Sequence, residues 1–96
     1  MKEYRYSYEK NEWLKKKRNI DFEKIKRALS NKRLVEVINH PNNKKYPNQR
    51  IFLMRIRKYI YAVPFIEEEA YIFLKTIYPS QKYTRQRLDK KLKVKR

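Results

Sequence analysis

Cationic side chains are the largest group in this sequence that could take part in chemistry. The 96 residues contain 27 Lys and Arg but only 10 Asp and Glu, with one histidine and no cysteine. Fixed cations can hold a phosphate and stabilise the negative charge that develops on it during a reaction. Metal chemistry is a poorer fit, because the one acidic run, Glu67 to Glu69, consists of consecutive residues that point in different directions. We interpret this run as a solvated hairpin tip.

His40 and Arg50 flank a turn-rich loop, and both could act on a phosphate. Histidine is the residue type whose ordinary pKa lies nearest neutral pH, so His40 is the natural candidate for proton transfer. It precedes Pro41, and the alternative is an ordinary surface residue of a turn. Arg50 opens the next predicted strand, and its alternative is a surface ion pair.

Lys75 interrupts an apolar strand with an ammonium group. It alternates with Tyr71, Phe73 and Ile77, so these four side chains are predicted to share one face of the strand. Either Lys75 reaches solvent at the edge of the sheet or it lines a pocket. We favour the pocket.

A short helix is predicted directly after this strand. Pro79 has no N–H to donate and ends the strand, and Ser80 is a suitable N-cap for the helix that follows. Leu88 and Leu92 are spaced to dock the helix on the rest of the domain.

The first turns of this helix are rich in polar groups. Gln81 and Arg85 lie four residues apart on one face, with Lys82 beside them. We predict that Lys75, Lys82 and Arg85 converge on one phosphate at the strand-to-helix junction. The alternative is a helix whose charges only keep it soluble.

Apolar periodicity indicates the elements that would position these groups. Helices are predicted over 8–18 and 22–30, strands over 33–38, 49–56, 58–66 and 71–78, and then the C-terminal helix. In the second helix Phe22, Ile25 and Leu29 form one apolar stripe. The order predicts an α+β fold with two N-terminal helices, a four-stranded antiparallel sheet and a C-terminal helix. Because the chain has no glycine, asparagines such as Asn19 are expected to take the left-handed positions.

The whole chain, residues 1–96, has the size of a single domain. Its net charge of +17 calls for an anionic partner. We predict no membrane partner, because the longest apolar run, Tyr59 to Ile66, holds a proline and is far shorter than the roughly 20 residues of a span. The start of the sequence has no hydrophobic signal segment, so a cytoplasmic location is expected. No cofactor and no thiolate metal site are predicted.

Four segments together resemble a known family. They are YSYEKNEWLKKKRNIDFEKI, VINHPNNKKYPNQRIF, YAVPFIEEE and FLKTIYPSQKYTRQRL. In this order they are similar to the BrnT-like toxins of bacterial and archaeal toxin-antitoxin pairs, within the RelE superfamily. The resemblance covers nearly the whole chain.

The resemblance implies an endoribonuclease that cuts cellular RNA without a metal ion, on a concave surface framed by the sheet and the terminal helix. It also implies a partner, an acidic antitoxin with a DNA-binding end. The expected catalytic residues are His40, Arg50, Lys75, Lys82 and Arg85, and the expected RNA-binding residues are Lys44, Lys45, Tyr46, Gln81 and Arg87. Tyr46 could stack on a base.

The sequence departs from the family at one functional position. Where the family pattern usually reads PSRKAT, this chain reads PSQKYT, so Gln81 replaces an arginine and Tyr83 a small residue. Glutamine cannot supply charge to a phosphate. An alternative function is therefore a non-catalytic, basic nucleic-acid-binding protein, for which charge and interleaved tyrosines are sufficient.

Overall fold

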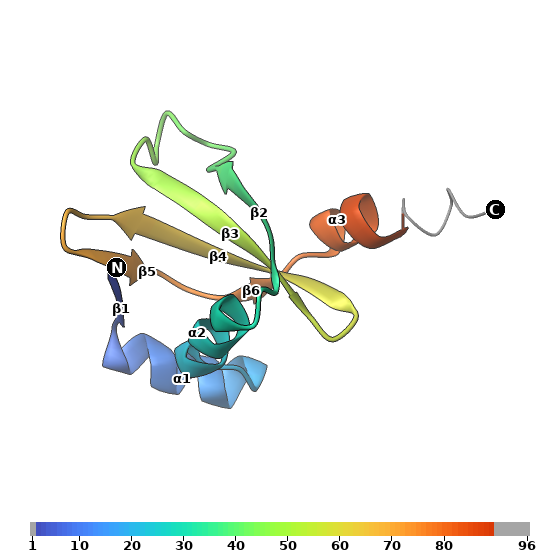
Figure 1. Cartoon of the computed structure of the whole chain (residues 1–96), viewed down its shortest axis with the longest axis horizontal. Helices are drawn as coiled ribbons and strands as arrows, with labels where there is room; N and C mark the ends of the chain where they lie inside the picture. Colours follow the sequence, from blue (N-terminus) through green and yellow to red (C-terminus); the bar gives the residue numbers. More distant parts are fainter. Residues whose placement is uncertain (1, 90–96) are drawn as a thin grey trace.

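The computed structural model describes residues 2–89 and has an α+β fold with three helices and a mixed sheet (Figure 1). The elements in chain order are β1 (Glu3–Tyr6), α1 (Tyr8–Arg18), α2 (Phe22–Ser30), β2 (Leu34–Asn39), β3 (Gln49–Ile56), β4 (Tyr59–Glu67), β5 (Tyr71–Leu74), β6 (Tyr78–Pro79), α3 (Gln81–Thr84) and a π-helical turn (Arg85–Asp89). The predicted α+β class is confirmed.

The sheet is larger than the four antiparallel strands predicted from the sequence. Its order is β1-β5-β4-β3-β2, and β6 pairs with β4. β1 runs parallel to β5, with Glu3 opposite Tyr71, whereas the other strand pairs are antiparallel. The short stretch Glu3–Tyr6 shows no apolar run, so it was missed; it becomes a strand because β5 offers it a free edge.

The predicted strand over 71–78 is two strands separated by a break. β5 ends at Leu74 and β6 begins at Tyr78. At the break the Lys75 N–H donates to the Pro64 carbonyl at 2.8 Å. Phe73 and Ile77 therefore do not share a face: Phe73 lines a surface hollow and Ile77 is fully buried in the main core.

Local capping interactions set the ends of α1 and α2. Ser7 and Asp21 are the N-caps, and their side chains accept from the N–H groups of Lys10 at 3.2 Å and Lys24 at 2.8 Å. Asn19 ends α1 in the left-handed conformation, with φ of 54°, as predicted. Such caps depend on neighbouring residues, which is why the bounds of both helices match the sequence-based prediction.

Two other left-handed residues are cations and were not predicted. Lys32 follows α2 with φ of 58°, and Arg57 sits in the β3–β4 turn with φ of 61°. Asn31 itself has φ of −92°. Positive φ is uncommon for residues other than glycine, asparagine and aspartate, so both turns hold a cation in a disfavoured conformation.

Alternate residues of β3 and β4 face two separate apolar clusters. Phe52 and Phe65 stack at 3.9 Å between ring centroids in the larger cluster, which α1 and α2 cover through Leu14, Phe22 and Ile25. The opposite face is covered by the C-terminal segment. There the cluster consists of Ile51, Leu53, Ile60 and Ala62, with Ile38, Tyr78, Tyr83 and Leu88 against it.

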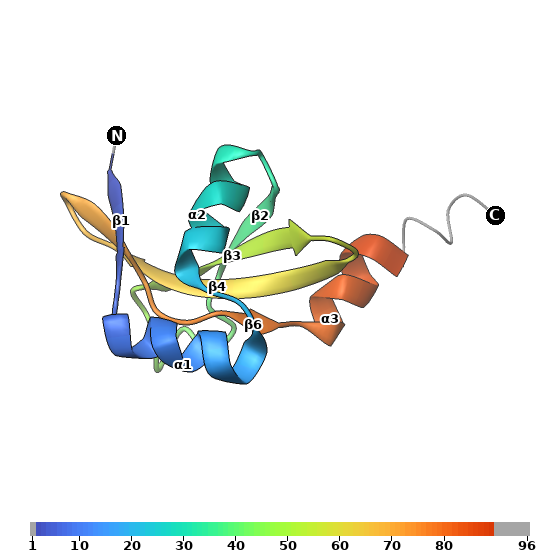
Figure 2. The ribbon, with the colours of Figure 1, turned by 90° about the horizontal axis from the view of Figure 1, so that it is seen from below.

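The C-terminal helix is short. α3 has one turn capped by Ser80, whose side chain accepts from the Tyr83 N–H at 3.1 Å, and it continues into the π-helical turn. Leu88 docks as predicted, whereas Leu92 lies outside the described residues. Figures 1 and 2 both place α3 at the opposite end of the molecule from β1. Within residues 2–89 no helix is both long and apolar enough to span a bilayer.

Candidate functional site

A surface hollow of about 710 Å³ brings three of the predicted site residues together. His40 and Tyr46 reach it from the loop after β2, and Lys75 reaches it from the break between β5 and β6. We call it the His40 hollow. Its other lining residues are Ser7, Lys10, Gln49, Pro64, Phe73, Thr76 and Tyr78.

The His40 ring is held by its own loop. Its Nδ1 accepts from the Asn42 N–H at 3.0 Å, and the ring lies 4.5 Å from the Tyr46 ring. An amide N–H can only donate, so Nδ1 is the acceptor and the proton of the neutral ring sits on Nε2. In this arrangement His40 can donate a hydrogen bond to a phosphate oxygen or to a leaving oxygen. A role as the base would require the Asn42 contact to break.

Of the cations predicted to be catalytic, Lys75 lines the hollow, whereas Arg50, Lys82 and Arg85 do not. The Lys75 side chain is exposed, and Nζ lies 5.6 Å from the Phe73 ring centroid. Lys75 thus lines the hollow and also reaches solvent, so the structure combines the two alternatives. Phe73 and Lys75 both line the hollow, as strand alternation predicts, and the alternation fails only at Ile77, which lies beyond the break in the main core.

Several lining residues were missed by the sequence analysis. Gln49 lies in the same motif as Tyr46, and its N–H donates to the Tyr46 carbonyl at 3.2 Å, so proximity in sequence could have indicated it. Lys10 and Tyr78 come from distant elements and carried no such signal. The pKa of Tyr78 is raised by burial and, to a smaller extent, by Tyr83. Tyr78 therefore stays protonated and can only donate to, or accept from, a ligand as a neutral phenol.

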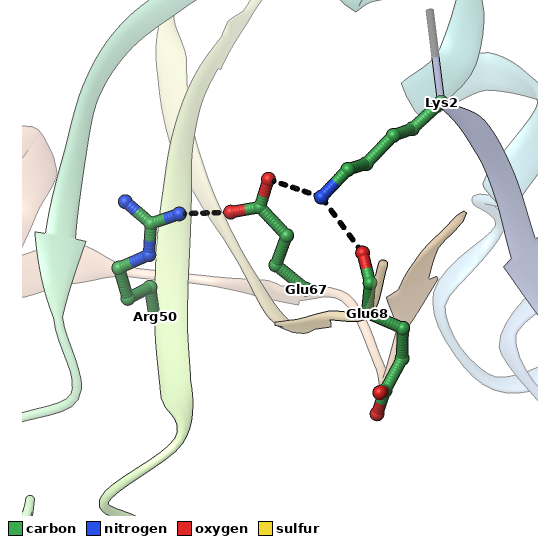
Figure 3. Close-up of polar contacts among 4 residues, drawn as sticks. All are labelled: Lys2, Arg50, Glu67 and Glu68. Atoms are coloured by element: carbon green, nitrogen blue, oxygen red, sulfur yellow. Dashed lines mark hydrogen bonds and ion pairs between the residues drawn. The ribbon is translucent and has the colours of Figure 1, made fainter. Parts of the chain in front are cut away.

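Arg50 lies on the other side of the sheet from the hollow. Gln49 lines the hollow, and because side chains alternate along a strand, Arg50 points away from it. Its guanidinium lies 5.2 Å from the Phe65 ring centroid and forms an ion pair with Glu67 at 2.5 Å. The Glu67 carboxylate also forms an ion pair with Lys2 at 2.9 Å (Figure 3). The hydrogen bond and positive charge of Lys2, and to a smaller extent those of Arg50, hold the pKa of Glu67 below its usual range. The surface ion pair is thus the alternative that the structure shows.

The predicted convergence of Lys75 with Lys82 and Arg85 is not observed. Lys82 and Arg85 are exposed on the C-terminal segment, and neither lines the His40 hollow. Lys82 Nζ lies 5.4 Å from the Tyr83 ring centroid. Gln81 is also exposed, so the departure from the family pattern falls outside the hollow.

The remaining RNA-binding candidates lie on two segments. Lys44 and Lys45 are exposed in the loop beside Tyr46, and Lys45 Nζ lies 5.4 Å from the Tyr46 ring centroid. Arg87 pairs with Glu36 of β2 at 2.8 Å, which ties the π-helical turn to the sheet. Lys44 and Lys45 lie in the loop that carries Tyr46 but do not line the hollow, whereas Arg87 has a structural partner.

The described residues contain no group of three or more His, Cys, Asp or Glu that could hold a metal ion. The chemistry that the hollow offers is cation and hydrogen-bond donation to an anion, beside aromatic rings. Comparisons of the chain with models of protein families, with curated proteins and with solved structures gave no significant match.

Proposed function

We propose that this protein is the toxin of a toxin-antitoxin pair, a cytoplasmic endoribonuclease of RelE-like fold that cuts RNA without a metal ion. The observation that carries the proposal is the His40 hollow. An imidazole and a phenol from the loop after β2 and an ammonium group from the break between β5 and β6 surround one space whose volume suits a nucleotide-sized ligand. The net charge of +17 favours a polyanion as that ligand.

Each of the three groups has a role that its geometry permits. Lys75 stabilises the negative charge of the phosphorane that forms when the 2′-oxygen attacks phosphorus. Tyr46 stacks on a neighbouring base. The Nε2–H of His40 donates a hydrogen bond to the 5′-oxygen and stabilises the negative charge that develops there as the P–O5′ bond breaks, while water supplies the proton. The proton of the 2′-hydroxyl passes to water, because the hollow is open to solvent, and the products are a 2′,3′-cyclic phosphate and a 5′-hydroxyl.

A second candidate function is a nucleic-acid-binding protein without catalysis. It is favoured by the positions of the other predicted catalytic cations. Arg50 is held by Glu67, and Lys82 and Arg85 do not line the hollow. A site with few cations aimed at one phosphate binds RNA more readily than it stabilises a phosphorane.

The two functions are separated by the products formed from a defined RNA with chelator present. The first predicts a 2′,3′-cyclic phosphate, and no cut in DNA of the same sequence because DNA lacks the 2′-hydroxyl. His40→Ala should lower the rate about 10²- to 10³-fold, whereas the control Lys16→Gln, an exposed residue of α1, should cut at the normal rate. RNA that is bound but never cut would leave the second function.

The proposed partner is a net-acidic antitoxin with a DNA-binding end. β2 lies at the edge of the sheet and exposes Leu34, Val35 and Val37 by 38, 42 and 37 %. An apolar edge strand can accept a strand from another chain. A second copy is disfavoured by the mutual repulsion of two chains of charge +17, whereas an acidic protein is attracted.

The partner is tested by co-expression with a small acidic protein encoded beside this one. Growth should be inhibited by this chain alone and restored by the pair, and the purified pair should melt at a higher temperature by mass action. A pair that melts no higher than this chain alone contradicts the proposal.

A further inference from the structure

A second hollow, distant from the His40 hollow, is lined mainly by cations. It has a volume of about 360 Å³ and lies between α2 and the β3–β4 turn. We call it the arginine hollow. Its charged lining residues are Lys24, Arg27, Arg33, Arg55 and Arg57, and its other lining residues are Ala28, Asn31 and Ile56.

The cations of the arginine hollow have no acidic partner among the described residues. No carboxylate lines the hollow, and none of the five cations takes part in an ion pair there. Arg50 and Arg87 differ in this respect, since each is paired with a glutamate. Five like charges held around one space repel one another, and an anion relieves that repulsion.

The backbone holds these cations in place. The Arg33 N–H donates to the Ala28 carbonyl and the Arg55 N–H donates to the Arg33 carbonyl, both at 2.9 Å. Arg57 is held at φ of 61° in the β3–β4 turn, a conformation that asparagine or glycine would adopt more easily. Disfavoured backbone conformations cluster at functional sites, and Arg57 combines one with a place in the lining of the hollow.

A smaller hollow of about 170 Å³ continues from the first one. It shares Lys24, Ile56 and Arg57 with the arginine hollow. It adds two tyrosines, Tyr59 and Tyr61, whose ring centroids are 6.0 Å apart. Cations and half-buried aromatic rings thus adjoin on one continuous surface, which is the combination that binds single-stranded nucleic acid through phosphates and stacked bases.

The arginine hollow and the His40 hollow are separate sites. Gln49 lines the His40 hollow and Ile56 lines the arginine hollow, and these residues are the two ends of β3. Seven steps of about 3.3 Å place them roughly 23 Å apart. In Figure 1 the loop that holds His40 and the β3–β4 turn lie at opposite ends of the β3–β4 hairpin.

We propose that the arginine hollow and the adjoining tyrosines form an RNA-binding exosite that holds a single strand outside the cleavage site. The choice of RNA rests on the proposed function. Arginine dominates the lining because its planar guanidinium can form two hydrogen bonds to one phosphate. The tyrosines favour RNA over an acidic protein, because bases stack on them and carboxylates do not.

The exosite is tested by binding of a fluorescent 2′-O-methyl RNA of about 20 nucleotides, longer than the roughly 4–16 nucleotides that one single-strand site covers. This RNA lacks the attacking hydroxyl, so binding is measured independently of cleavage. Arg33→Gln combined with Arg55→Gln should weaken binding about tenfold or more. The slope of log K against log salt should become shallower by about 1.4, or about 0.7 for each lost phosphate contact.

The matched control is Lys16→Gln combined with Lys17→Gln, which removes the same charge from exposed positions of α1 outside both hollows. A second variant, Arg27→Gln with Arg57→Asn, tests the site from other elements and suits the positive φ at position 57. Melting temperatures establish that each variant is folded. The exosite is contradicted if both arginine variants bind RNA as tightly as the lysine control.

A parallel measurement with poly-glutamate distinguishes the other anionic occupant. The exosite predicts that the arginine variants and the lysine control lose poly-glutamate affinity equally. A loss of poly-glutamate binding alone would assign the hollow to an acidic protein and overturn the proposal. RNA binding that depends on the arginines without any cleavage by the native protein would retain the exosite and reject the proposed reaction.

Discussion

Lys75 and Lys82 differ in one respect that matters to the proposed reaction, since only Lys75 lines the His40 hollow. Lys75→Ala should lower the rate of RNA cleavage about 10²- to 10³-fold, the usual cost of losing a group that stabilises the transition state. Lys82→Ala and Arg85→Ala should change the rate much less, because both side chains lie elsewhere. The measurement is single-turnover cleavage of one defined RNA. Equal losses for all three variants would mean that the C-terminal segment reaches the phosphate when RNA binds.

The buried Asn11 is a residue on which the two N-terminal helices depend. Its side chain is 6 % exposed, and its Oδ1 accepts from the Phe22 N–H at 2.8 Å. Asn11→Ala should leave that buried N–H without a partner and lower the free energy of unfolding by about 1–3 kcal/mol. Urea unfolding provides the value. Asn43→Ala, in an exposed loop, is the control, and an equally small effect of both changes would mean that water replaces the lost acceptor.

At the scale of elements, β1 is tied to α2 by one hydrogen bond. The Tyr6 phenol donates to the Glu23 carboxylate, and the Tyr6 ring stacks on Phe22 at 4.8 Å. The hydrogen bond to Glu23 is the main cause that raises the pKa of Tyr6 to about 12. The bond to Tyr6 likewise is the main cause that lowers the pKa of Glu23.

These pKa shifts predict how the stabilisation of the fold by the Tyr6–Glu23 hydrogen bond depends on pH. Because the pKa of Glu23 is lowered on folding, its contribution to stability is present above the pKa of the unfolded chain, about 4.3, and is lost as the pH falls through the folded pKa. Because the pKa of Tyr6 is raised on folding, its contribution to stability is present below about pH 10 and is lost as the pH rises toward 12. Tyr6→Phe keeps the stacking and should lower the unfolding free energy by about 0.5 kcal/mol at pH 7, because the pair is exposed. A difference between Tyr6→Phe and the native protein that stays constant from acid to alkaline pH would contradict this account.

At the scale of the whole molecule, the net charge of +17 is the property that should govern RNA binding. RNA binding should weaken steeply with salt, since each neutralised phosphate adds about −0.7 to the slope of log K against log salt on a single strand. Fluorescence anisotropy at several salt concentrations measures the slope. A flat response would mean that stacking, rather than charge, holds the RNA.

The sequence by itself determined the elements that depend on neighbouring residues. The bounds of α1, α2 and β3 follow from caps and from apolar periodicity within a few residues. It also identified His40, Tyr46 and Lys75, which the hollow contains, because an unusual side chain in a short motif is visible without knowledge of the fold.

The tertiary structure alone decided which distant groups meet. The parallel pairing of β1 with β5 joins strands that are more than 60 residues apart in the sequence, Glu3 lying opposite Tyr71, and no local pattern encodes a partner so far away. The direction of Arg50 depends on the strand register, since a shift of one residue moves a side chain to the other face. The five cations of the arginine hollow come from α2, the segment after it, β3 and the β3–β4 turn. In a sequence with 27 basic residues only the pairing of strands and helices shows which of them gather around one space.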